Sequence, residues 1–593
     1  MTADSVVVAP VALDAAVEPA LAPTPEPRDR AALRFALLVG AAVLVGLGLR
    51  IAIGLTDDAP STDETAYLRS GESLAEGHGF ARGVDRPELH FPPLVPFLFG
   101  MTGKVVDDPH SGAVMVTVVA ATLAVLPLAF TARRLGGYRA GVITAWVAAL
   151  TPAISTTLFI RGGGSEGPYT LVVATAVMLV VYAAGTRGTT RALQVAGAGL
   201  AVGLAYLTRP EGLFFALPLG VAVLYLAWRD GQPDHEPGEA WHRVWRRGGP
   251  RAVARAAAPA VAFGVPIVVC VVPYAAFLHS HTGSWELSAK TQDASIEAWL
   301  AVAQDDRQAR DVVLYDIDDE FRFTAESHSL PSLALDDPGG YASIVAANVE
   351  KLYTTVVPAE GGIWVRWQLL PLPVVALAAW GAWRHRSRSM ALIVGVALLP
   401  VVTSLIFFVQ PRYLVGTAAL ATIPVGLLLA GMAAPRARLF GGVALAFLAT
   451  SSIFAFHGPG GWWHPNDHTS LESAGKWIAE NTELNDRIMA RSQIVEYYAH
   501  RTTIALPYTD YPQMLAYGRH YGVQYLVLDA NTAANLRPQF EFLRDVDVAP
   551  GLKLVHESLG EGGATRVFAF HPATPVADAP PGPHLGFVGD GVA

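Results

Sequence analysis

Cysteine and charged residues are both scarce in this chain of 593 residues. The single cysteine, Cys270, lies inside an apolar run, so a disulfide framework or a multi-thiolate metal site is excluded. Charged residues make up 16% of the chain, whereas soluble domains average roughly 25%. Basic residues are outnumbered by acidic ones, 42 against 51, which argues against a nucleic-acid binder. With a mean hydropathy of +0.36, this composition argues against a soluble protein.

Common nucleotide-binding and metalloprotease motifs are missing as well. The sequence contains no GxxxxGK phosphate loop, no GxGxxG after a strand and no HExxH. A nucleotide-driven pump is therefore disfavoured. No internal repeat supports a two-fold transporter architecture.

Long apolar runs are what the sequence has instead. From Ala31 onward they recur at about 20 residues each, the length at which a helix crosses roughly 30 Å of hydrocarbon. Residues 1–30 lack the basic region and apolar core of a signal peptide and are expected to be a disordered cytoplasmic tail. We predict about eleven transmembrane helices, at residues 32–54, 111–132, 139–159, 167–185, 192–207, 212–228, 256–278, 367–383, 390–409, 414–433 and 439–456.

The arginines give this set of helices an orientation, because cytoplasmic connections carry an excess of Lys and Arg. With a cytoplasmic N-terminus, every inside connection is rich in arginine, whereas the short outside connections hold one each, namely Arg161, Arg209 and Arg412. The sequence thus predicts a multi-pass protein of the cell membrane. Three larger segments then lie outside the cytoplasm, residues 55–110, 279–365 and 457–593.

The two C-terminal outer segments differ in character. The loop 279–365 is acidic and too long for a simple connector, so we expect short helices lying along the membrane. Residues 457–593 follow the membrane domain, 31–456, and alternate helix and strand patterns. They predict a small extracytoplasmic α/β domain with a disordered end from about Pro572. Its expected elements are a helix at 471–481, a strand at 487–491, a helix at 511–521 and a buried strand at 523–529.

The first outer loop contains the most informative stretch. Ser61 and Glu64 have the spacing of a capping box, which predicts a helix with Asp63 and Glu64 in its first turn. Both acids could simply complement the helix dipole, an effect of roughly 0.3–1 kcal/mol each. Asp63 and Tyr67, however, share one helix face, where a carboxylate could accept a proton from a hydroxyl nucleophile.

The three outside arginines run against the positive-inside bias. Each could be a snorkelling side chain paired with a nearby acid, such as Glu166 or Glu211, and we favour this interpretation for Arg161. For Arg209 and Arg412 we favour a function. Several guanidinium groups near the outer interface would bind a lipid-linked phosphate through paired, charge-assisted hydrogen bonds.

The first outer loop ends with His90, Phe91 and a proline pair, followed by a helix expected at 94–101 in or near the interface. His90 is either a solvated loop histidine or a hydrogen-bond donor at the phosphate site. With Asp63, Glu64 and His78 in the same loop, a divalent metal is conceivable. No tight ligand spacing supports one, so we predict neither a metal site nor another cofactor.

Taken in order, these motifs resemble the membrane glycosyltransferases of the GT-C superfamily. The resemblance rests on an Asp-Glu pair opening a helix after the first membrane span, an aromatic residue four positions after the Asp, and a closing Pro-Pro-Leu. The nearest branch contains protein O-mannosyltransferases, the lipid A aminoarabinose transferase and the RgtA/B/C/D-like bacterial enzymes. The resemblance covers about residues 31 to 570. It includes further elements in the same order, namely Ser165-Glu166, residues 208–212, Arg412-Tyr413, residues 474–481 and residues 525–529.

The resemblance implies transfer of a single sugar from a polyprenyl-phosphate donor to an extracytoplasmic acceptor, with inversion. Asp63 and Glu64 would be the catalytic pair, with Asp63 as the general base. Some relatives carry a Lys just before the loop proline, where this chain has Phe91, so His90 could compensate in binding phosphate. The donor phosphate would be held by Tyr67, Arg209, Arg412, Tyr413 and His90, with support from Arg161, Glu166 and Glu211.

Two other functions remain open from the residues. A lipid-linked sugar flippase or transporter would need polar or charged groups inside its helices, whereas here the ionisable groups collect at one face. A noncatalytic cell-envelope scaffold would make the Asp-Glu loop dispensable. The sequence leaves open the sugar, the oligomeric state and the acceptor, which is a polysaccharide, a lipid or a protein.

Overall fold

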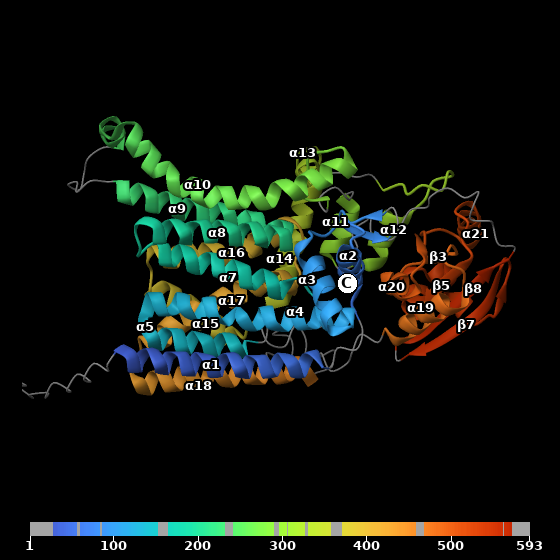
Figure 1. Ribbon diagram of the computed structural model, residues 1–593. Coiled ribbons are helices and arrows are strands. Elements are labelled where there is room, and N and C mark those ends of the chain that lie inside the picture. The colour runs from blue at the N-terminus through green and yellow to red at the C-terminus, as the bar shows by residue number, and fades with distance from the viewer. Residues whose placement is uncertain are drawn as a thin grey trace, which may run out of the picture.

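The computed structural model describes residues 28–55, 60–83, 86–151, 164–231, 241–289, 296–304, 306–325, 330–356, 370–457, 468–560 and 562–571. Figure 1 shows an elongated molecule with a bundle of long helices at one end and an α/β domain at the other. Shorter helices lie between the two. Residues 1–27 of the tail predicted to be disordered, and the predicted disordered end from about Pro572, lie outside the described residues, whereas residues 28–30 of that tail are helical.

The bundle is built from apolar helices that overlap the predicted transmembrane segments, although residues 152–159 and 367–369 of these segments lie outside the described residues. Within the described ranges, seven stretches are long and apolar enough to cross a membrane. Gly137, at φ 80°, interrupts α5, so two predicted segments meet inside that element. The membrane-protein class is confirmed, while the number of eleven spans stays a prediction. The bundle helices are α1 (Arg28–Gly54), α4 (Pro109–Leu123), α5 (Val125–Leu150), α7 (Glu166–Ala183), α8 (Gly188–Thr208), α9 (Ala216–Gly231), α10 (Trp241–Thr282), α15 (Leu372–Arg384), α16 (Arg388–Ile406), α17 (Val415–Ala430) and α18 (Ala434–His457).

Small residues let these helices pack closely, as is usual between helices in a membrane. A Cβ atom at Gly199 of α8 would lie 2.0 Å from the carbonyl oxygen of Phe263 on α10, so only glycine fits there. The core between α5, α7, α8 and α17 is rich in buried alanine and valine. On the outside, α1 and α10 expose leucines and valines, such as Leu44 and Val269, which suits contact with lipid.

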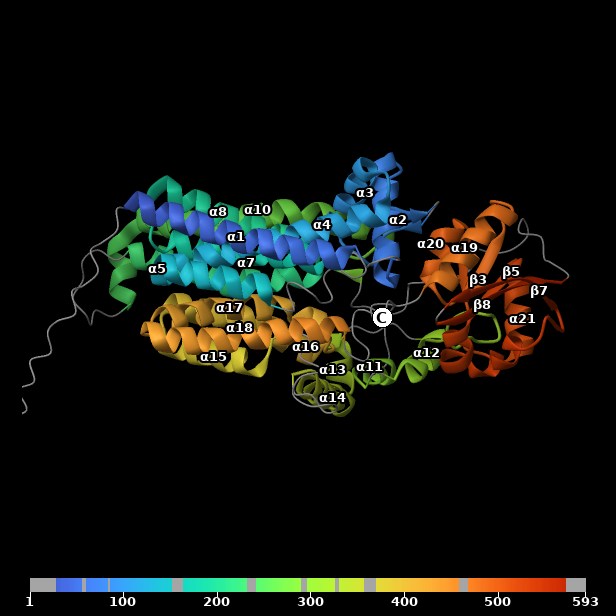
Figure 2. The ribbon, with the colours of Figure 1, turned by 90° about the horizontal axis from the view of Figure 1, so that it is seen from below.

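Between the bundle and the α/β domain lies a middle layer. Figure 2 shows α2 and α3 on one side of this layer and α11 to α14 on the other. Short helices are thus found in the long loop, as predicted, and the helix expected at 94–101 is α3. The elements of this layer are α2 (Thr62–Glu76), β1 (Ala81–Gly83), β2 (Arg86–Pro87), α3 (Leu94–Val106), α11 (Ile296–Ala303), α12 (Arg307–Tyr315), α13 (Leu330–Asp336) and α14 (Pro338–Val356). Two 3₁₀ turns, η1 (Pro210–Phe215) and η3 (Pro411–Leu414), lead into α9 and α17.

The α/β domain, residues 468–571, contains a six-stranded sheet in the order β4-β3-β5-β8-β7-β6. Strands β4, β3 and β5 are parallel, and β8, β7 and β6 are antiparallel to their neighbours. Alternate residues face opposite sides, because Ile488 and Val527 pack with α19 while Met489 and Leu526 pack with α21. The elements are α19 (Thr469–Asn481), β3 (Arg487–Ala490), α20 (Gln493–Ala499), β4 (Thr502–Ala505), α21 (Tyr511–His520), β5 (Tyr525–Asp529), η4 (Thr532–Leu536), η5 (Pro538–Arg544), β6 (Val548–Ala549), β7 (Leu552–Gly560) and β8 (Gly563–Phe570).

Candidate active site

Helix α2 begins with the capping box that the sequence predicts. The Ser61 hydroxyl accepts a hydrogen bond from the Glu64 N–H at 3.4 Å, and Glu64 Oε2 accepts one from the Ser61 N–H at 3.1 Å. The Glu64 side chain is fully buried, and its other oxygen lies 2.7 Å from Nδ1 of His110 on α4. Glu64 therefore fixes the first turn of α2 against α4 and leaves the neighbouring Asp63 to face another partner.

That partner of Asp63 is Arg412, from η3 at the start of α17. Nη1 of Arg412 lies 2.6 Å from Oδ2 of Asp63, and Nε of Arg412 donates to Oε1 of Gln410 at 2.7 Å. The Asp63 and Arg412 side chains are 13% and 20% exposed, so a small ligand can still reach the pair. A carboxylate and a guanidinium that are 349 positions apart in the sequence thus meet at the end of the bundle that faces the α/β domain.

A second arginine, Arg209, lies at the C-terminal end of α8. Its Nη1 donates to Glu166 at 2.8 Å and to the Ser165 hydroxyl at 3.2 Å, and its Nε donates to Glu211 at 2.6 Å. Burial alone would lower the pKa of Arg209, but the carboxylates of Glu211 and Glu166 outweigh this effect and raise it. Arg209 is therefore a fixed cation, held in the pairing with Glu166 and Glu211 that the snorkelling interpretation expects.

Tyr413 joins the two arginines. The centre of its ring lies 4.7 Å from Cζ of Arg209 and 5.5 Å from Cζ of Arg412, distances at which a guanidinium is attracted to an aromatic face. The guanidinium groups therefore share one aromatic contact. Two cations near each other can bind one anion between them.

Tyr67 lies one turn after Asp63 on α2 and is buried against Phe91 and Phe99. Burial raises the pKa of the Tyr67 hydroxyl, and the negative charge of Asp63 raises it further. Tyr67 is thus a neutral hydrogen-bond donor. Phe91 packs on the Tyr67 ring with 4.4 Å between ring centres.

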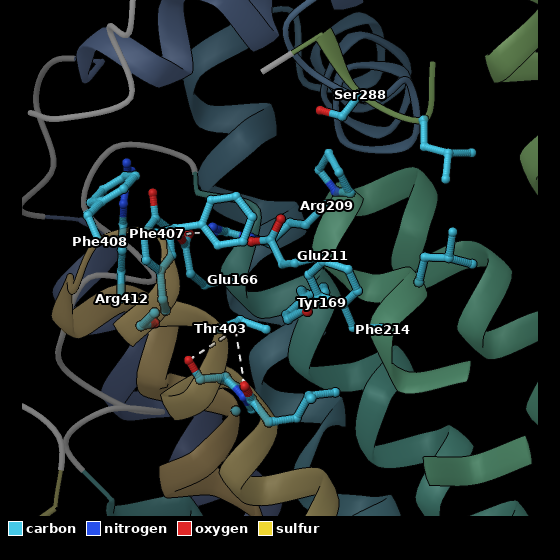
Figure 3. A pocket seen from close by; sticks show the side chains of 18 of the residues that line it. Glu166, Tyr169, Arg209, Glu211, Phe214, Ser288, Thr403, Phe407, Phe408 and Arg412 are labelled. Atoms are coloured by element: carbon cyan, nitrogen blue, oxygen red, sulfur yellow. Dashed lines mark hydrogen bonds and ion pairs between the residues drawn. The ribbon is translucent and has the colours of Figure 1, made fainter. Parts of the chain in front are cut away.

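A cavity of about 610 Å³ opens beside the arginines. Figure 3 shows Glu166, Arg209 and Glu211 grouped on its wall, with Arg412 and Phe408 to one side. His90 and Glu286 also line it. The remainder is mostly apolar and comes from α7, η1, residues 285–288, α11, α12, α16 and the start of α17. Among the described residues that line the cavity, Arg412 is present but its partner Asp63 is not. Arg412 therefore connects the cavity to a carboxylate that lies beyond it.

The structure thus brings together most of the predicted site residues. These are Asp63, Tyr67, Arg209, Arg412 and Tyr413, with Glu166, Glu211 and His90 on the cavity wall. Glu64 lies next to Asp63 in the chain but is directed toward His110. Arg161 lies outside the described residues.

Sequence reasoning missed His110, because a histidine in the first turn of an apolar helix shows no pattern of its own. It also missed the contribution of the long loop, since Trp299 of α11 lines the cavity. Within the described ranges, there is no group of three or more His, Cys, Asp or Glu side chains that could hold a metal ion.

Comparisons with known proteins agree with this architecture. Residues 90–235, less than half of the chain, match the profile of the family described as dolichyl-phosphate-mannose-protein mannosyltransferase. No curated protein sequence matches the chain. The oligosaccharyltransferase of Archaeoglobus fulgidus, solved in complex with Zn and sulfate, is 14% identical and superposes with a TM-score of 0.51 over 92% of this chain and 74% of that chain. The same enzyme tethered to an acceptor peptide gives 13% identity and the same TM-score of 0.51, over 92% of this chain and 74% of that chain.

A weaker likeness is found to ArnT of Cupriavidus metallidurans bound to undecaprenyl phosphate. Identity is 14% over 93% of this chain and 100% of that chain, with a TM-score of 0.38. The superposition on the oligosaccharyltransferase shows a shared fold. The chain has the fold of the GT-C membrane glycosyltransferases, and the resemblance predicted from the Asp-Glu loop is confirmed.

Proposed function

We propose that the protein is an inverting glycosyltransferase that moves a single sugar from a polyprenyl-phosphate donor to an extracytoplasmic acceptor. The observation that carries the proposal is the Asp63–Arg412 pair, in which Arg412 lies on the wall of the cavity beside Arg209 and Asp63 lies behind Arg412. The acceptor is a hydroxyl-bearing glycan, lipid or protein of the cell envelope.

The cavity suits a lipid-linked phosphate. Arg209 and Arg412 lie at its polar end, and guanidinium groups bind phosphate through two parallel charge-assisted hydrogen bonds. The apolar remainder of the cavity suits an isoprenoid chain. The name of the matching family supports the same class of donor, a sugar carried on a polyprenol phosphate. His90 on the cavity wall and the neutral hydroxyl of Tyr67 would add hydrogen bonds.

The chemistry follows from the two sides of Arg412. When the bond from sugar to phosphate breaks, negative charge develops on the lipid phosphate, and fixed cations on the cavity side stabilise it. Asp63, on the other side of Arg412, would take the proton from the acceptor hydroxyl. The hydroxyl then attacks the anomeric carbon opposite to the leaving phosphate, which inverts the configuration at that carbon. No nucleotide enters the reaction.

The orientation in the membrane rests on the arginine-rich connections. In Figure 1 the connections from α7 to α8 and from α15 to α16, the end of α9 and the start of α10 lie at the end of the bundle away from the α/β domain. Arg187, Arg229 and Arg386 belong to these connections or flank them. By the positive-inside rule, that end and the N-terminus would be cytoplasmic, and the site and the α/β domain extracytoplasmic.

Sugar transfer in isolated membranes tests the proposal. Radiolabelled polyprenyl phosphates that carry different sugars are offered in parallel to membranes with wild-type protein, Asp63→Asn or Glu76→Gln. Glu76, at the far end of α2, is exposed and serves as the matched control. We expect one sugar to give labelled product with the wild type and the control but not with Asp63→Asn. Full transfer by Asp63→Asn would contradict the mechanism, and lipid binding without transfer of any sugar would favour a flippase.

A further inference from the structure

Helices α11 and α12, termed the roof here, close one side of the cavity. Ala298, Trp299 and Val302 of α11 and Leu314 of α12 all line it. The ring of Trp299 lies 6.0 Å from the ring of Phe408, which in turn lies 5.3 Å from the ring of Tyr413. Because Tyr413 contacts both arginines, the roof is adjacent to the polar end of the cavity as well as to its apolar part.

One end of the roof is anchored to the bundle. Helix α11 packs against α14, whose Asn348 is fully buried. The Asn348 amide donates hydrogen bonds to the carbonyl oxygens of Leu405 and Phe407, at the C-terminal end of α16, at 3.1 and 3.0 Å. The α11 side of the roof therefore follows the bundle.

The other end of the roof is anchored to the α/β domain. After α12 the chain continues into the core of that domain, where Ile317 packs among residues of the sheet. The Tyr508 N–H donates to the Tyr315 carbonyl at 2.7 Å, and the Tyr521 hydroxyl donates to the Phe321 carbonyl at 2.9 Å. Residues 315–321 of the long loop are thus structurally part of the α/β domain.

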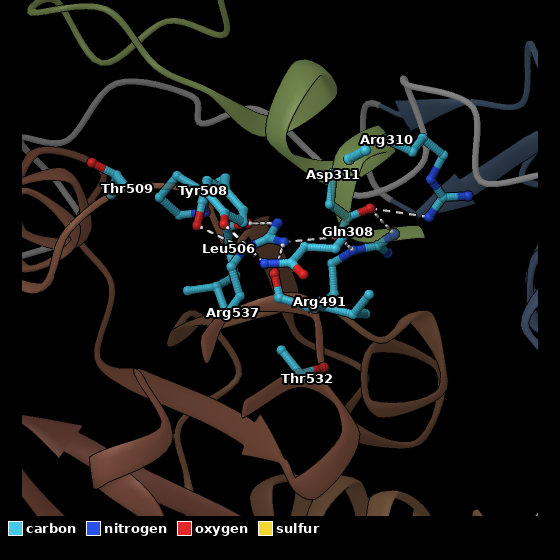
Figure 4. Close-up of polar contacts among 12 residues, drawn as sticks. Gln308, Arg310, Asp311, Arg491, Leu506, Tyr508, Thr509, Thr532 and Arg537 are labelled. Carbon is cyan, nitrogen blue, oxygen red and sulfur yellow. Dashed lines mark hydrogen bonds and ion pairs between the residues drawn. The ribbon is translucent and has the colours of Figure 1, made fainter. Parts of the chain in front are cut away.

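Asp311 of α12 is the strongest of these anchors. It is fully buried and accepts two hydrogen bonds from Arg491, at 2.8 and 3.1 Å, and one from Arg537 at 2.8 Å (Figure 4). Arg310 adds a third guanidinium at 3.0 Å. Three cations thus converge on one carboxylate, and a buried charge that loses its partner is strongly unfavourable. Removing the Asp311 charge should therefore release α12 from the α/β domain.

We propose that Asp311 is a positioning residue for the donor site: through it, the α/β domain holds the roof against the cavity and so sets the affinity for the lipid-linked sugar donor. The proposal rests on the proposed function, because it takes the occupant of the cavity to be a polyprenyl phosphate. It gives the α/β domain a role at the donor site, whatever the acceptor is. Asp311 acts through the roof and does not itself touch the ligand.

Binding of undecaprenyl phosphate to the purified full-length protein in detergent tests this role. The variants are Asp311→Asn, Trp299→Ala, their double variant, and Glu557→Gln as control. Glu557 pairs with Arg566 at 2.7 Å in the same domain, on the strand hairpin and not on the roof. We expect a Kd at least about fivefold weaker for Asp311→Asn and for Trp299→Ala, and a wild-type Kd for the control. If Asp311 acts through the roof, the Kd of the double variant is no higher than the higher Kd of the two single variants, because the effects of coupled positions do not add.

Hydrogen–deuterium exchange supplies a readout that does not need the ligand. Peptides that cover residues 296–315 should exchange faster in Asp311→Asn than in the wild type or in Glu557→Gln. Wild-type affinity and unchanged exchange in Asp311→Asn would overturn the proposal, and so would additive effects in the double variant. If wild-type protein bound no polyprenyl phosphate, the proposed function would fail, while exchange would still report whether Asp311 holds the roof. Should Asp311→Asn not fold, Arg491→Lys removes the paired hydrogen bonds but keeps the charge, and a smaller shift of both readouts in the same direction is expected.

Discussion

Replacing Arg412 with glutamine removes the cation that connects the cavity to Asp63. Nη1 of Arg412 lies 2.6 Å from Oδ2 of Asp63. Two unit charges about 4 Å apart at an effective dielectric of about 20 attract each other by about 4 kcal/mol. The partial exposure of both side chains, 20% and 13%, reduces the net effect below this limit. Loss of one fixed hydrogen-bond donor at a site of developing charge costs about 2.7–4 kcal/mol, or about 10²–10³-fold in rate.

Steady-state transfer of labelled sugar from a polyprenyl phosphate measures this loss. For Arg412→Gln we expect kcat to fall about 10²-fold and the KM for the donor to rise, since the guanidinium both binds the phosphate and stabilises its departure. Arg519→Gln, an exposed position on α21, is the control and should behave as the wild type. Wild-type kcat and donor KM in Arg412→Gln would refute the assignment of Arg412 to the phosphate.

Three further substitutions test the surroundings of the site. His110→Ala leaves the buried Glu64 carboxylate without its ring partner, so the free energy of unfolding should fall by about 1–3 kcal/mol, and kcat should change more than KM. An unchanged melting temperature would contradict the positioning role of His110. Burial alone would raise the pKa of Asp311, but the surrounding arginines hold it well below its usual value, so the stability it contributes is present above pH about 4 and lost as pH falls further. The free energy of unfolding of the wild type should therefore exceed that of Asp311→Asn at pH 7, and this difference should shrink as pH falls below about 4. A difference that stays constant with pH would contradict this prediction. His500 lies 2.6 Å from Nη1 of Arg69, and burial together with nearby arginines lowers the pKa of His500. The stability contributed by His500 is thus present above pH about 6.5 and lost as pH falls below this value. Asparagine tolerates the positive φ of this position, so His500→Asn should flatten the dependence of melting temperature on pH between about 5 and 7. An unchanged slope would argue against the contact with Arg69.

Local features of the site were predictable from the sequence. The Ser61–Glu64 capping box is a short-range pattern, and the structure contains it with both hydrogen bonds. Arg209 and Arg412 stand out in the sequence because they violate the positive-inside bias, and recognising this violation needs only the order of the apolar segments. In the α/β domain, strand β5 was predicted from its apolar run.

Long-range pairings could not be predicted in the same way. Asp63 and Arg412 are separated by 349 positions, and only the folded bundle brings η3 against the start of α2. The pairing of Glu64 with His110 depends likewise on the packing of α2 on α4. The hairpin of β7 and β8 was missed because its strands mix exposed polar and apolar residues.

The start of the α/β domain is a second feature that depends on long-range contacts. The sequence places the α/β domain after residue 457, but Asp311 and Ile317 of the preceding loop contribute to its interior. Such a contribution leaves no local signal, because an acidic residue in an acidic loop is expected to be solvated. Only the convergence of Arg491 and Arg537 on Asp311 shows that its charge is a structural one.

Single-turnover transfer with Asp63→Asn tests the central claim most directly. Detergent-solubilised protein is first saturated with the labelled sugar donor, acceptor is added, and the release of polyprenyl phosphate and the configuration of the product are followed. If Asp63 is the general base, the variant binds the donor with wild-type affinity but transfers the sugar about 10²–10⁴-fold more slowly, and the wild-type product is inverted. Transfer at the wild-type rate by Asp63→Asn, or retention of configuration, would contradict the mechanism.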